Sequence, residues 1–402
     1  MIKILKISAE GLPLYDGKCE INFINTQRTT SNDTEGMYKL SSSNANRLYT
    51  NNIESFFGIN ASGKTTVLRL ISFVFSVLNN EQINKIKYCG ILGEGNEQNE
   101  IVFDVVFVNC NTVNLLHTVI KYVDEHYTII EEYIKSRKLL ASDNKTSVFD
   151  FSSATTIMKR KDDEQFLVDD ISIIVGYKKA EKTTIVFSDM LDTTNINRLK
   201  LLKEYPLSVL SYFDPKIEYI NTREINGKTV IYLKFRGEKE KVLYDLEELN
   251  TYLSSGTIKG INVFGRAISL FETGGYLIID DLENHFNHEI VSTLIRFFTD
   301  KRVNPHGATL IFSTHYSELL EHIERNDCIY IVENKDRITI NPLNERMQRN
   351  DENKVQSFKS GLIGNTAPSY EAYIQLKKSI INKVEAIIPS PVRPWLSHRP
   401  PR

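Results

Sequence analysis

The sequence predicts an α/β fold with a mixed sheet, an antiparallel β subdomain and an inserted, partly helical arm. A glycine-rich loop over 58–65 lies between the end of an apolar strand and an apolar helical run at 67–78. Apolar runs at 276–281 and 308–315 end in polar side chains and alternate with helical patterns, which is typical of a parallel sheet covered by helices. Three segments rich in β-branched and aromatic residues follow one another with short turns and predict an antiparallel meander: 101–108, 115–122 and 127–133.

The loop fits the pattern G-x-x-x-x-G-K-[ST], which binds phosphate groups. Gly58 and Gly63 let successive backbone N–H groups point at phosphate oxygens, and the following helix adds the partial positive charge of its N-terminus. Lys64 reaches the β- and γ-phosphates, and Thr65 supplies a hydroxyl for Mg²⁺. We expect a nucleoside triphosphate site built from Gly58, Asn60, Ala61, Ser62, Gly63, Lys64, Thr65 and Thr66.

Composition excludes several classes of protein. The 402 residues carry a formal net charge of −2, so there is no overall basic field of the kind that attracts nucleic acid. The four cysteines lack C-x-x-C spacing, which argues against zinc or a disulfide framework and favours a cytoplasmic protein. We expect no signal peptide and no membrane span, since the apolar run at 67–78 is too short to cross a bilayer.

We expect four parts along the chain. An N-terminal lobe over 1–135 carries the phosphate loop and the antiparallel subdomain, and an arm over 136–206 contains basic clusters. A second lobe over 207–345 carries the later motifs, and 346–402 form a helical region with a disordered, proline-rich tail.

Smaller expectations concern local structure. Residues 2–9 and 19–23 read as a hairpin, and 26–52 as one long polar loop. Strands are expected at 217–220 and 230–235, and the start of a helix near 243–249. The adenine-stacking residue is not identified; Tyr38 and Tyr49 in the polar loop are the candidates.

Three later motifs place polar residues at one edge of the expected sheet, where ligands of parallel sheets bind. Asp280 is the expected Mg²⁺ partner of Thr65. Asp281 faces the attacking water as a base or orienting group. His315 hydrogen-bonds the γ-phosphate or the water. Strand-end or capping roles are the alternatives for the acids.

Leu253 is followed by Ser254, Ser255 and Gly256 at the start of an amphipathic helix that runs through Leu270. Small hydroxyl residues and glycine at a helix N-terminus form a second anion-binding nest. A chain cannot wrap this nest onto its own phosphate loop if both lie on one face. We therefore expect two nucleotides held between two chains, as a homodimer or a higher homo-oligomer.

This order of motifs resembles the ABC-type ATPase heads, whose relatives include SMC proteins, coiled-coil DNA repair ATPases, and the OLD and abortive-infection ATPases of bacteria. The resemblance implies ATP and Mg²⁺ as cofactors. Residues 58–66 look like Walker A, and 253–256 like the signature motif. Asp280 looks like the Walker B aspartate and His315 like the switch histidine, and the D-loop begins at 283–286. The wording of 60–66 is most similar to the bacterial defence group.

One position departs from the family pattern. Asp281 stands where the family usually has glutamate, and its carboxylate is about 1.5 Å shorter in reach. A misplacement of about 1 Å can cost on the order of a hundredfold in rate. We therefore expect slow hydrolysis and a long-lived ATP-bound dimer, unless Glu283 substitutes for the missing glutamate.

The chain lacks two features of its relatives. About 190 residues separate the two glycine motifs, without the sustained heptads of a long coiled coil, and no D-x-D cluster of a TOPRIM nuclease follows His315. We expect an ATPase sensor or scaffold of an antiphage system that controls a separately encoded effector, a nuclease or a toxin. Alternatives are a DNA repair or DNA-clamping ATPase, for which DNA is a partner, and, more weakly, a soluble transporter subunit.

Overall fold

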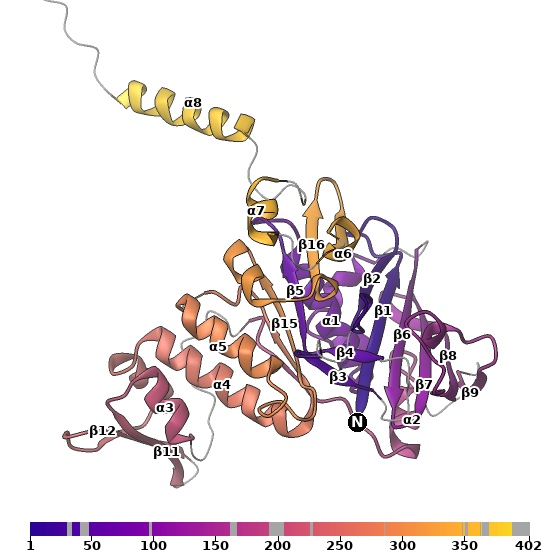
Figure 1. Ribbon diagram of the computed structural model, residues 1–402, viewed down its shortest axis with the longest axis horizontal. Coiled ribbons are helices and arrows are strands. Elements are labelled where there is room, and N and C mark those ends of the chain that lie inside the picture. The colour runs from indigo at the N-terminus through magenta and orange to yellow at the C-terminus, as the bar shows by residue number, and fades with distance from the viewer. Residues whose placement is uncertain are drawn as a thin grey trace, which may run out of the picture.

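The structure is a computed structural model (Figure 1). It describes the following residues: 1–29, 34–40, 48–95, 99–160, 167–192, 205–225, 228–284, 286–347, 349, 353–361, 363 and 370–387. Two six-stranded sheets lie on either side of one helix, and further helices cover the outer face of the second sheet (Figure 1). This α/β arrangement with a parallel-containing sheet agrees with the predicted fold class.

The second sheet carries the polar strand ends and has the order β10-β14-β15-β5-β16-β17. Its first five strands run parallel and β17 is antiparallel to β16. The central strands are buried on both faces, which explains their continuous apolar runs. The bounds are β5 Ile53–Phe57, β10 Phe187–Asp189, β14 Tyr276–Ile279, β15 Thr309–Thr314, β16 Ile329–Asn334 and β17 Ile338–Pro342.

The other large sheet is antiparallel, with the order β2-β1-β6-β7-β8-β9. It contains the predicted hairpin of β1 and β2 and the predicted meander of β6, β7 and β8. The bounds are β1 Ile2–Glu10, β2 Cys19–Asn22, β6 Glu100–Asn109, β7 Thr112–Val123, β8 His126–Lys138 and β9 Thr155–Lys159.

Helix α1, Lys64–Leu78, packs between the two sheets, and its apolar side chains belong to the core cluster that both sheets line. A helix covered on both sides has to be apolar around most of its circumference, as this one is. Helices α4, Ser255–Thr273, and α5, His288–Thr299, pack on the opposite face of the parallel sheet and form a second core. The carboxyl ends of the parallel strands thus form an edge of the sheet that lies between α1 on one face and α4 on the other.

A smaller subdomain precedes α4. It comprises α3 Leu207–Phe213, β11 Ile217–Ile225, β12 Lys228–Phe235 and β13 Lys241–Leu243. The strands expected at 217–220 and 230–235 form an antiparallel hairpin. The helix start expected near 243–249 is that of a 3₁₀ helix, η4 Leu246–Thr251, which follows β13 and begins with a capping box of Asp245 and Glu248.

Two other expectations need correction. The polar stretch 26–52 contains a two-stranded sheet of β3, Met37–Lys39, and β4, Tyr49–Asn51. The range 136–206, expected as an arm, contributes β9 to the antiparallel sheet and β10 to the parallel sheet around a short helix, α2 Ile174–Ala180. Residues 161–166 and 193–204 of that range lie outside the described residues. Strands of three to five residues are too short to show a period in sequence.

The remaining elements are short, apart from the last. The 3₁₀ turns are η1 Ile83–Lys85, η2 Cys89–Leu92, η3 Ser147–Phe149, η5 Ser317–His322 and η6 Asn326–Cys328, and the C-terminal helices are α6 Leu343–Arg346, α7 Lys354–Lys359 and α8 Tyr370–Ile387. In Figure 1, α8 lies away from the sheets. The proline-rich end, 388–402, lies outside the described residues. Within the described part of the chain, every helix is too short or too polar to cross a lipid bilayer. Apart from the strands found within 136–206, the expected division into four parts stays a prediction.

Candidate nucleotide-binding and catalytic site

The glycine-rich loop connects the end of β5 to the first residue of α1. Neither glycine can be replaced by a residue that carries a Cβ, and the reasons differ. At Gly58 a Cβ would lie 2.4 Å from Ser62 Oγ and 2.5 Å from the Val332 carbonyl oxygen. At Gly63 the backbone has φ +97°, and a Cβ would lie 2.6 Å from the Ile338 side chain. The loop is therefore held tightly against β16 and β17.

Lys64 is buried and lies along the loop. Its Nζ donates to the carbonyl oxygens of Gly58 at 2.9 Å and Ile59 at 3.0 Å. Burial lowers the pKa of Lys64, and the carboxylates of Asp281, Asp280 and Glu283 oppose that shift. A phosphate group next to this ammonium would supply the anion that the buried cation needs.

Thr65 and Asp280 lie together as predicted for a cation site. Thr65 Oγ1 donates to Asp280 Oδ2 at 2.7 Å. Ser313 at the end of β15 donates to the other carboxylate oxygen of Asp280 and accepts from the Asp281 N–H at 2.8 Å. A hydroxyl and a carboxylate at the end of a rigid strand form a hard-oxygen donor set that suits Mg²⁺. Sequence reasoning missed the role of Ser313, although it lies directly before Thr314 and His315 on a strand adjacent to β14.

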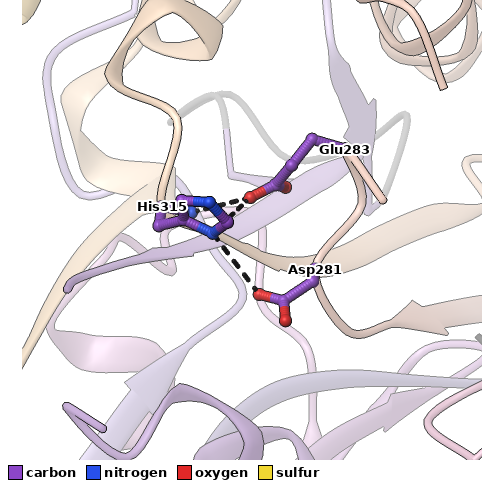
Figure 2. A group of neighbouring side chains, drawn as sticks. All are labelled: Asp281, Glu283 and His315. Carbon is purple, nitrogen blue, oxygen red and sulfur yellow. Dashed lines mark hydrogen bonds and ion pairs between the residues drawn. The ribbon is translucent and has the colours of Figure 1, made fainter. Parts of the chain in front are cut away.

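Asp281, Glu283 and His315 form a cluster beside this pair (Figure 2). Glu283 is buried; its Oε1 lies 2.7 Å from His315 Nδ1 and accepts from the His315 backbone N–H at 3.0 Å. Asp281 Oδ1 lies 3.9 Å from the same ring nitrogen. The three ligand atoms lie within 4.8 Å of one another, a set that could also hold a cation.

The surroundings of Asp281 shift the pKa of its carboxyl group upwards. Burial raises its pKa, the nearby carboxylates of Asp280 and Glu283 raise it further, and Lys64 and His315 oppose them. Its backbone is left-handed, with φ 43°, because the chain turns sharply after β14. This conformation is better tolerated by aspartate than by most residues.

The signature-like residues start α4. Ser254 is the N-cap: its Oγ accepts from the Thr257 N–H at 3.0 Å and lies 2.8 Å from Thr257 Oγ1. Ser255 and Gly256 are the first two residues of the helix. Their expected contact with a phosphate group of the nucleotide bound by a second chain stays a prediction.

A second residue that sequence reasoning missed is Lys259, one helical turn further along α4. Its Nζ donates to the Asn284 carbonyl oxygen at 2.5 Å. Its pKa is lowered to about 8 by burial, against the carboxylates of Glu283, Asp281 and Asp280. No pattern in the sequence distinguishes it from a surface lysine.

The tyrosines named as adenine candidates lie elsewhere. Tyr38 packs against Gly307 and under the ammonium of Lys3, 5.0 Å from its ring centroid. Gly307 precedes β15, and Tyr49 belongs to β4, which precedes β5. Because these strands are parallel, both tyrosines lie towards the amino ends of the strands, opposite the phosphate loop at their carboxyl ends.

Comparison with known proteins adds one finding. Residues 55–321 match the protein family described as "AAA domain, putative AbiEii toxin, Type IV TA system". The match covers about two thirds of the chain and includes the phosphate loop, the start of α4, the two acids after β14 and His315. No curated protein matches the chain.

Proposed function

Because the chain belongs to the family of AAA domains described for the putative AbiEii toxin of type IV toxin–antitoxin systems, we propose that it binds ATP, hydrolyses it slowly and controls a separately encoded effector in bacterial antiphage defence. The family supports an ATPase domain and a link to toxin–antitoxin systems. The observation that carries the chemistry is the 2.7 Å contact of Thr65 with Asp280, which lies near Lys64 and near the Asp281–Glu283–His315 cluster.

Each residue has a distinct part in hydrolysis. The loop amides and Lys64 would bind the phosphates, and Thr65 and Asp280 would hold Mg²⁺, which would neutralise phosphate charge. Asp281 accepts a proton from, or orients, the attacking water. His315 contacts the γ-phosphate. Glu283 contacts both the backbone and the ring of His315, which supports a positioning role over substitution for Asp281, the alternative that the sequence left open.

Hydrolysis is slow because the carboxylate of Asp281 reaches less far than a glutamate would. An ATP-bound state then persists. Two chains hold two nucleotides between Lys64 and Asp280 of one copy and Ser255 and Gly256 of the other, and the effector, a nuclease or a toxin, responds to that state.

The test is nucleotide binding and turnover by the purified full chain. We expect Mg²⁺-dependent ATP binding that Lys64→Ala abolishes, and hydrolysis that Asp281→Asn abolishes while leaving binding intact. Purification with the product of the neighbouring gene, with and without ATP, then tests the effector. Nucleotide affinity that survives Lys64→Ala, or turnover of many per second by the wild-type chain, would contradict the proposal.

A further inference from the structure

Lys259 is an unusual side chain for the interior of α4. It is 4% exposed, although an isolated ammonium is among the most costly groups to bury. It lies about 6 Å along the helix from Ser255, since four residues make about one turn. Its Nζ contacts the Asn284 carbonyl oxygen at 2.5 Å and lies 5.2 Å from the ring centroid of Phe286. The lysine therefore joins α4 to the turn that follows β14.

Packing alone does not require a lysine at this position. A neutral side chain of similar length would fill the same space without the cost of desolvating a charge. What the ammonium adds is a charge-assisted hydrogen bond to the turn and attraction to the carboxylates of Glu283, Asp281 and Asp280.

The turn that Lys259 contacts also carries the catalytic acids. The Asn284 N–H donates to the Asp281 carbonyl oxygen at 2.9 Å, so the residue that Lys259 holds closes the turn begun by Asp281. Glu283, one residue earlier, contacts His315. A displacement of α4 by a fraction of an ångström would therefore reach Asp281, Glu283 and His315 through a single short contact.

We propose that Lys259 is a positioning residue that couples the N-terminus of α4 to the Asp281–Glu283–His315 cluster of its own chain. A phosphate group of the second chain's nucleotide at 254–256 then sets the geometry for hydrolysis of the first chain's own nucleotide. This inference rests on the proposed function, because it requires both ATP hydrolysis and the two-chain arrangement. It makes hydrolysis dependent on pairing, beyond binding.

The test compares Lys259→Met, Lys259→Arg and a matched control. Lys178→Met is the control, because Lys178, although less buried, also donates to a backbone carbonyl, that of Leu78 at the far end of α1. For Lys259→Met we expect kcat to fall by about 10- to 100-fold, since a misplacement of about 1 Å costs that much. KM for ATP and ATP affinity should change less than about twofold. Because hydrolysis depends on pairing, the specific activity of the wild type should rise with protein concentration, and in Lys259→Met this rise should disappear. Lys259→Arg, which keeps the cation, should recover most of kcat, and Lys178→Met should match the wild type.

The outcomes separate this inference from the function on which it rests. A Lys259→Met protein with wild-type kcat and wild-type concentration dependence would overturn the role of Lys259 and leave the ATPase proposal standing. A wild-type chain that neither binds nor hydrolyses ATP would overturn the proposed function itself. If Lys259→Met does not fold, Lys259→Gln keeps a donor for the Asn284 carbonyl without the charge. An unchanged kcat in Lys259→Gln would contradict the proposal. A kcat in Lys259→Arg well below that of the wild type would contradict it as well.

Discussion

Asp281 combines two opposing effects at a single position, reach and backbone conformation. Asp281→Glu lengthens the side chain towards the attacking water, where a correction of about 1 Å is worth up to about a hundredfold in rate. The left-handed φ of 43° disfavours the longer residue by about 1 kcal/mol. The gain in reach is the larger effect, so we expect kcat to rise about tenfold and the free energy of unfolding to fall by about 1 kcal/mol or less.

Steady-state ATP turnover and denaturant unfolding of the same preparations measure both changes. Asp281→Asn, which has the same size and tolerates the same φ, is the control and should show binding without turnover. An Asp281→Glu protein with unchanged or lower kcat would mean that reach does not limit the rate.

Glu54 leads to a prediction about stability. It is fully buried on β5 and lies far in sequence from the acids of the site. Burial raises the pKa of Glu54 well above its ordinary value near 4.5, and the Asn51 amide donates to its Oε1 at 3.0 Å. Between the unfolded and folded pKa values the native state binds more protons than the unfolded state. Stability from Glu54 is therefore complete below pH 4.5 and is lost as the pH rises towards its folded pKa.

The measurement is the free energy of unfolding at several pH values from 5 to 8. Each unit of pKa difference corresponds to about 1.4 kcal/mol, so the wild type should lose stability over this range. Glu54→Gln keeps the shape and an acceptor for Asn51 but does not titrate, and its curve should be flatter by that amount. Parallel curves for the two proteins would contradict the prediction.

At the scale of elements, the pairing of β14 with β15 positions two acids at once: Asp280, the proposed Mg²⁺ ligand, and Asp281, the proposed catalytic acid. Ser313 on β15 donates to Asp280 and accepts from the Asp281 N–H, so one hydroxyl fixes both acids. Ser313→Ala leaves a partly buried N–H without its acceptor, which costs about 1–3 kcal/mol. We expect kcat to fall about tenfold and half-saturation by Mg²⁺ to shift to higher concentration.

Titration of activity with Mg²⁺ at saturating ATP measures this effect. Ser292→Ala is a suitable control, because Ser292 is also buried and hydrogen-bonded, but to His288 and His322 on another part of the fold. Equal effects of the two substitutions on Mg²⁺ dependence would show that Ser313 acts only through general stability.

The same elements show which features can be predicted from the sequence. The parallel strands and the phosphate loop can be predicted because each apolar run is followed, within a few residues, by polar side chains. Strand β10 is not visible, because three residues gain their meaning only from pairing with β14, almost ninety positions later. The contact of Glu283 with His315 likewise joins residues 32 positions apart, and a buried Lys259 looks like any lysine in sequence.

At the scale of the whole molecule, both faces of the parallel sheet are committed to packing, while the edge that carries the site lies between α1 and α4. At that edge Lys64 begins α1, and Asp280 and His315 directly follow β14 and β15, while 254–256 form the N-terminus of α4. In the proposed arrangement a second copy brings its 254–256 to this edge, and association completes the site. The proposal therefore predicts that the oligomeric state depends on ATP.

Asp281→Asn should trap that state, since we expect this variant to bind ATP without hydrolysing it. We expect this variant to be monomeric without nucleotide and dimeric or larger with ATP and Mg²⁺, by light scattering after size-exclusion chromatography. Adding Ser255→Arg places a bulky side chain at the first residue of α4 and should prevent ATP-dependent association, while ATP affinity falls about tenfold or less because Lys64 and the loop remain. Lys64→Ala should prevent both binding and association. If the Ser255→Arg protein still associates with ATP, the nucleotide is not held between two chains, and the signature-like residues at the start of α4 serve another purpose.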